Sequence, residues 1–105
     1  MKKYSKDRLK SLFSKLSKTN ASSLGIFVTA CDPDFDTSLS ILLGLPEAGA
    51  DMIELGMPFS DPMADGPSIQ ASSQRALKAG ASLERTLEMV KLFRKSNYTT
   101  PVILM

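Results

Sequence analysis

Residues 50–67 read ADMIELGMPFSDPMADGP, and this stretch decides the fold. Residues 51–55 form a short and mostly apolar run. The run predicts a strand, because it is too short for a helix and because Gly56, where the chain is expected to turn, and Pro58 end it. Behind it lies a loop rich in proline and acidic residues.

The strand carries one acid, Glu54, which alternation places on the opposite face from Ile53 and Leu55. If both faces of a parallel sheet are covered, the Glu54 carboxyl group lies in an apolar wall at the carboxyl end of a strand. Desolvation there favours the protonated acid, which suits a group that gives and takes a proton. A structural glutamate, paired with a lysine or capping a helix, is the alternative.

An earlier strand is predicted over residues 24–30, between turn-forming residues. Asp34 or Asp36 is expected to cap the helix that follows, and Pro46 should shorten that helix. The unit is strand, helix, strand, which implies parallel neighbouring strands. The apolar stripe of this helix is expected to contain Leu39, Leu42 and Leu43.

Two helices and a third strand are predicted after the loop. Pro67 suits the first position of one helix, which Ala79-Gly80 ends, and Ser82 should cap the next. The third strand is expected over residues 102–105, where the chain stops without a turn, as a truncated product would. The expected apolar side of the first helix is Ile69, Ser73, Ala76 and Leu77. In the second helix it is Leu83, Leu87 and Val90, with Met89, Leu92 and Phe93 alongside.

Composition limits the other possibilities. The chain has 105 residues, 43% of them hydrophobic, and a net charge of +2, which predicts one ordinary globular domain and gives no reason to expect nucleic acid or membrane binding. A basic start with apolar residues at helical spacing predicts an amphipathic helix near residues 9–16. Without histidine, and with Cys31 as the one cysteine, carboxylates are the remaining acid-base groups and a reducing compartment is favoured. A calcium or magnesium site built from aspartates is formally open, but the spacing matches no known loop.

Residues 53–67, IELGMPFSDPMADGP, resemble the signature of the tryptophan synthase alpha chain family. The likeness extends to residues 27–33, 47–51 and 101–105. It implies a (β/α)8 TIM barrel, of which residues 1–105 would be one partial domain holding the first three strands, a leading helix and an extra helix after strand two. A complete barrel takes about 250 residues.

The resemblance also implies roles for particular side chains. Glu54 matches the family's catalytic glutamate, which acts as general acid-base, and Asp65 matches an aspartate that contacts the indole nitrogen. Phe27 and Met105 match residues that line the indole pocket. From the residues alone, Asp65 could equally be a turn or cap residue and Phe27 an ordinary core side chain.

The proline-rich loop matches a segment that faces the family's beta chain, through Pro58, Phe59 and Asp61. A rigid loop is the alternative interpretation of the same prolines. Where this sequence has Cys31, the family usually has glycine, so a position with a positive backbone angle would strain the cysteine.

The reaction implied is the retro-aldol cleavage of indole-3-glycerol phosphate to indole and glyceraldehyde 3-phosphate, in the cytoplasm, without metal or organic cofactor. The enzyme would be a lyase of tryptophan biosynthesis, assembled with the beta chain as an alpha2beta2 heterotetramer. Phosphate in such barrels is held after strands seven and eight, so the 105-residue piece alone is expected to be inactive. The alternative is a catalytically incomplete piece that only folds, self-associates or binds the beta chain.

Overall fold

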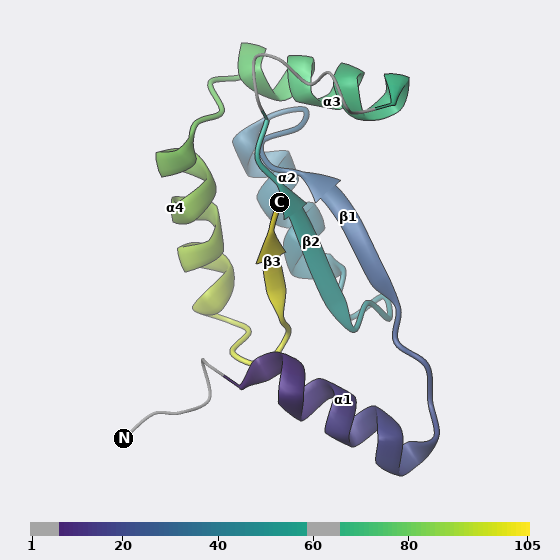
Figure 1. Cartoon of the computed structure of the whole chain (residues 1–105). Coiled ribbons are helices and arrows are strands. Elements are labelled where there is room, and N and C mark those ends of the chain that lie inside the picture. Colours follow the sequence, from purple (N-terminus) through teal and green to yellow (C-terminus); the bar gives the residue numbers. More distant parts are fainter. Residues whose placement is uncertain (1–6, 59–65) are drawn as a thin grey trace.

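The computed structural model describes residues 7–58 and 66–105. Three strands form one parallel sheet in the order β1-β2-β3. Helices α2 and α4 cover one face of it, while α1 lies at the amino ends of the strands and α3 at their carboxyl ends (Figure 1). The elements are α1 (Arg8–Thr19), β1 (Gly25–Thr29), α2 (Phe35–Gly44), β2 (Met52–Gly56), α3 (Pro67–Lys78), α4 (Leu83–Arg94) and β3 (Val102–Leu104).

The ends of the helices follow the local signals in the sequence. The Asp34 carboxylate caps α2 by accepting the Thr37 N–H at 2.8 Å. The Ser82 hydroxyl caps α4 in the same way, accepting the Arg85 N–H at 3.1 Å. Pro67 begins α3, where a missing N–H leaves no helical hydrogen bond unmade. These predicted caps and starts are confirmed.

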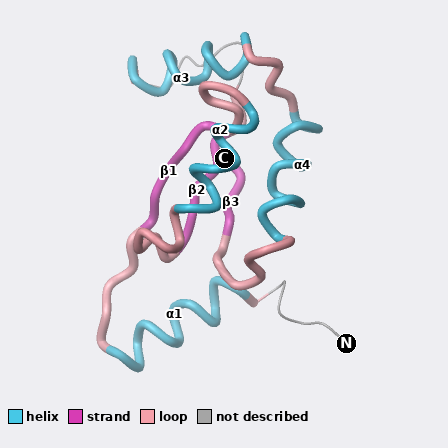
Figure 2. Tube along the Cα trace, turned by 180° about the vertical axis from the view of Figure 1, so that it is seen from behind, coloured by secondary structure: helices cyan, strands magenta, loops and turns pink. Residues whose placement is uncertain are grey.

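The core lies between the sheet and the helices behind it (Figure 2). Ile53 and Leu55 of β2 are fully buried there. They pack in one cluster with Leu42 of α2, and with Met89 and Phe93 of α4. The face of β2 that was predicted to be apolar is therefore the face that the helices cover.

The predicted apolar side of α4 was right only in part, since Val90, Met89 and Phe93 pack in or against the core cluster. Leu83 and Leu87 are 55% and 48% exposed, whereas Thr86, Met89 and Phe93 are fully buried. Both sets recur at spacings of three and four, so periodicity alone does not choose between them. The side that carries the Phe93 ring is buried because it packs against α2 and the sheet.

Two other helix sides differ in part. In α2, Leu42 is fully buried but Leu43 is 39% exposed. In α3, Leu77 is exposed, while Ser72 and Ser73 are buried beside Ala76. Small side chains allow α3 to come close to β1, which is why the buried side of this helix is poor in large apolar residues.

The described helices cover one face of β2, the face that carries Ile53 and Leu55. Among the residues that the structure describes, no helix lies over the face of the sheet that carries Glu54 (Figure 1).

Helix α1 packs less closely than the other helices. It buries no residue completely, and Phe13 is 49% exposed. In the described ranges no helix has the length and apolar character needed to cross a bilayer.

Candidate functional site

The strand register gathers one face of the sheet around Glu54. Phe27 of β1 is the direct partner of Glu54, and Ile103 of β3 is its partner on the other side. Paired residues of adjacent strands share a face. The open face therefore carries an aromatic ring, a carboxylate and an aliphatic side chain in one row across the three strands.

Glu54 is half-buried on this face. Within residues 7–58 and 66–105 it has no hydrogen-bond or ion-pair partner. The two structural roles considered for it, a lysine pair and a helix cap, are therefore not seen in this part of the chain.

A cleft of about 270 Å³ opens at the carboxyl end of β1. It reaches from Phe27 along β1 to α2 and to the amino-terminal half of α3. Its polar groups are hydroxyls and one carboxylate, set among aliphatic and aromatic surface. The lining residues are Phe27, Val28, Thr29, Asp32, Ser38, Ile41, Ser68, Ile69 and Ser72.

The ring of Phe27 lies directly against Gly56. A Cβ atom added to Gly56 would come within 2.5 Å of the Phe27 Cζ atom and 2.8 Å of its Cε1 atom. The ring thus leans from β1 across β2 toward the carboxyl end of the sheet. Phe27 is 37% exposed, on the face of the sheet that the described helices leave open.

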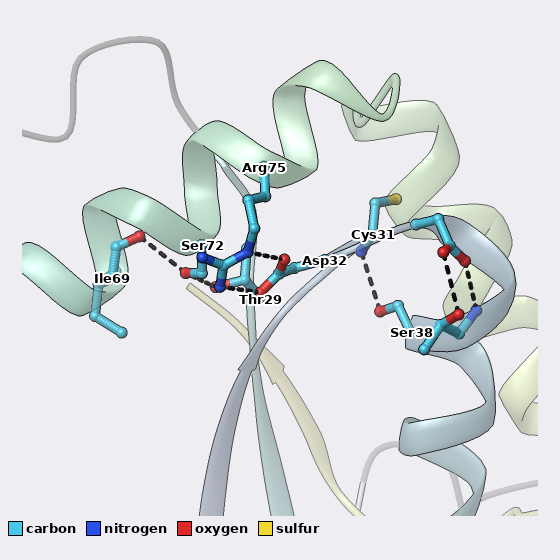
Figure 3. Close-up of polar contacts among 9 residues, drawn as sticks. Thr29, Cys31, Asp32, Ser38, Ile69, Ser72 and Arg75 are labelled. Atoms are coloured by element: carbon cyan, nitrogen blue, oxygen red, sulfur yellow. Dashed lines mark hydrogen bonds and ion pairs between the residues drawn. The ribbon is translucent and has the colours of Figure 1, made fainter.

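Side-chain contacts attach α3 to the end of β1 (Figure 3). The hydroxyls of Thr29 and Ser72 are hydrogen-bonded at 2.8 Å, and Ser72 Oγ also lies 2.9 Å from the Ile69 carbonyl oxygen, to which it can donate. Arg75 donates to Asp32 through Nε at 2.8 Å and Nη2 at 3.0 Å. The sequence analysis missed these contacts, although the pair of serines within a helix was a signal of a buried polar side.

The loop after β1 contains the residue that departs from the family pattern. Cys31 has a φ of 69°, so this position does require the left-handed region, and its side chain is buried in the core cluster. Its N–H donates to Ser38 Oγ at 3.0 Å. Burial raises the pKa of the Cys31 thiol, and the positive charge of Arg85 opposes this only in part.

Three of the predicted site residues, Asp65, Phe59 and Asp61, lie outside the described residues. Pro58 is half-buried just after β2. Met105 lies beside β2, since its N–H donates to the Leu55 carbonyl at 3.0 Å, and its side chain is 56% exposed.

Parallel strands joined by helices that cover one face of the sheet are the architecture of a segment of a (β/α) barrel. The family is then identified by its sequence model. The chain belongs to the tryptophan synthase alpha chain family, whose model matches residues 13–105.

Individual relatives agree with this. A tryptophan synthase alpha chain from Gluconobacter oxydans is 54% identical over 98 residues, which are 93% of this chain and 36% of the relative. The crystal structure of tryptophan synthase subunit alpha from Legionella pneumophila superposes with a TM-score of 0.91 at 43% identity, over 93% of this chain and 37% of that one. A structure of tryptophan synthase from M. tuberculosis in an aminoacrylate-bound form gives a TM-score of 0.85 at 31% identity, over 93% of this chain and 39% of that one.

The chain therefore spans little more than a third of the relatives that it matches. The predicted fold class, the first three strands of a TIM barrel with a leading helix and an extra helix, is confirmed.

Proposed function

We propose that these residues are the amino-terminal part of an alpha subunit of tryptophan synthase, a carbon-carbon lyase that cleaves indole-3-glycerol phosphate to indole and glyceraldehyde 3-phosphate. Residues 1–105 would form one unit of the barrel. A cytoplasmic setting and pairing with a beta chain in an alpha2beta2 assembly belong to the same proposal, through the family.

The observation that carries the proposal is the state of Glu54. A half-buried carboxylate without a partner in the described residues, on the open face at the carboxyl end of β2, has no structural task there. Catalytic groups in these barrels come from the carboxyl ends of strands. Cleavage needs one proton delivered to the indole carbon and one removed from the glycerol hydroxyl, and a carboxyl group that changes protonation can take part in both.

The other site residues enter with different roles. Asp65 would contact the indole nitrogen, and Phe27 and Met105 would form walls for the flat indole ring. Exposed Phe27 beside a cleft supports that role. Pro58, Phe59 and Asp61 would face the beta chain. The phosphate would be held by parts of the barrel beyond these residues.

The test is a complete barrel made by joining residues 1–105 to the part of the Gluconobacter oxydans relative that follows the matched region. We expect this chimera to release indole from indole-3-glycerol phosphate. Glu54→Gln should lower kcat by about 10²- to 10⁴-fold, the range of general acid-base catalysis. Glu47→Gln, which changes an exposed carboxylate, is the control and should keep the parent rate. A folded chimera whose indole release does not depend on Glu54 would refute the proposal.

The open sheet edges favour a second candidate, a piece that associates rather than catalyses. Among the described residues, β1 and β3 each pair only with β2. Unpaired edges invite pairing with another chain. Sedimentation of the 105-residue chain decides this: a concentration-independent monomer contradicts self-association, while an assembly that releases no indole supports it.

A further inference from the structure

Gly56 is the residue on which the Phe27 ring lies. It is the last residue of β2, two positions after Glu54, and it is paired with Thr29 of β1. Phe27 is two positions before Thr29, so its ring reaches diagonally across the strand pair to cover Gly56. A glycine inside a strand often marks a place where another group approaches the backbone closely.

The contact leaves no room for any side chain on Gly56. Ordinary contacts of a Cβ atom begin at 3.4 Å, whereas this one would be at 2.5 Å from the ring. The atoms in the way belong to the ring and not to the backbone. An added methyl group would therefore lift the ring off the sheet by about 1 Å, toward the open face, because overlap at this distance is strongly repulsive.

The lifted ring would take space on the open face of the sheet. Phe27 is 37% exposed and is the strand partner of Glu54, so the two side chains share that face. From this geometry we infer that Gly56 is a positioning residue: it holds the Phe27 ring low on the sheet and so makes room beside Glu54 for a flat, fused-ring aromatic group. The inference deepens the proposed function and rests on it.

The first test is a double-mutant cycle in the chimera described above. Gly56→Ala should raise KM for indole-3-glycerol phosphate by about tenfold, the scale of one misplaced carbon in an apolar pocket, with a smaller change in kcat. In a Phe27→Leu background the same substitution should raise KM by less than about twofold, because the shorter side chain no longer covers Gly56. Equal costs in both backgrounds, or an unchanged KM in Gly56→Ala, would overturn the inference.

The matched control is Gly25→Ala in β1. Gly25 lies at the amino end of the sheet, and its added Cβ would meet only the flexible Met52 side chain, at 3.2 Å. It should leave KM unchanged. A KM that rises as much as in Gly56→Ala would show a general effect of strand glycines and would overturn the inference.

A second double-mutant cycle measures stability instead of activity. Urea unfolding of the 105-residue chain with Gly56→Ala, Phe27→Leu and both changes should give non-additive midpoints, with the double variant more stable than the sum of the single effects predicts. Additive midpoints would overturn the inference. A parent chimera without Glu54-dependent indole release would instead refute the proposed function, so the two failures are distinguishable.

Discussion

Phe93→Ala is expected to be among the most damaging single changes in α4. Phe93 is fully buried in the cluster that joins α4 to α2 and the sheet. Removing a buried phenylalanine ring costs about 3–5 kcal/mol. Native proteins are stable by only about 5–15 kcal/mol in total, so a loss of this size is a large one.

Leu87→Ala is the matched control on the same helix. Leu87 is 48% exposed, so truncation loses only part of the transfer free energy, about 1 kcal/mol or less, and alanine is the better helix former. The pair compares the side of α4 that the structure assigns to the core with the side that carries Leu83 and Leu87.

Urea unfolding followed by far-ultraviolet circular dichroism measures the difference. We expect the midpoint of Phe93→Ala to lie about 1–2 M below that of Leu87→Ala, given the usual slope for small proteins. If Phe93→Ala is already unfolded without urea, Phe93→Leu gives the same ranking at a smaller cost. A midpoint for Leu87→Ala as low as that of Phe93→Ala would refute the assignment of the buried side.

Three further predictions concern single positions. Gly80 has a φ of +94°, so Gly80→Ala should destabilise the chain by about 1 kcal/mol or more. Gly44 lies in a helix with no atom near an added Cβ, so Gly44→Ala should stabilise the chain by about 0.4–1 kcal/mol. Thermal melting of the two variants compares these effects. The N–H and hydroxyl of Thr37 lower the pKa of Asp34 from its ordinary value of 3.8. The stabilisation that this gives is present above pH 3.8 and is lost as the pH falls through the lower folded-state pKa. The free energy of unfolding, measured against pH, should show this acid loss in the parent chain and not in Asp34→Asn. Burial raises the pKa of the Cys31 thiol above its ordinary value of 9.0. The contribution of the thiol to the free energy of unfolding is therefore complete below pH 9 and is lost as the pH rises toward the folded-state pKa. Urea unfolding at a series of pH values should show this alkaline loss in the parent chain and not in Cys31→Ala.

Local signals in the sequence predicted the order of elements because each depends on neighbours in the chain. Asp34 and Ser82 cap helices through N–H groups three residues on, and Pro67 begins a helix without any distant contact. Strand limits were less accurate, since Gly56 extends β2 only through its pairing with Thr29. The position of Gly56 at the end of the strand was predicted as a turn.

The candidate site could be predicted only in part. The alternation in β2 set Glu54 apart from Ile53, and the structure keeps them on separate faces. The contact of Phe27 with Gly56 joins two strands that a helix separates in sequence. The periodicity of apolar residues reports on one helix or strand at a time, so it does not predict a contact between two strands.

The attachment of α3 has a consequence for how this part of the barrel can change. Thr29 and Asp32 hold α3 to β1, and neither bond involves residues 59–65, which connect β2 to α3. Substitutions or small insertions in that connection are therefore insulated from the placement of the helix. Evolution can therefore vary the positions that would meet a partner, apart from Asp65, while leaving the wall of the cleft unaltered, so partner preference is free to change under a conserved substrate contact.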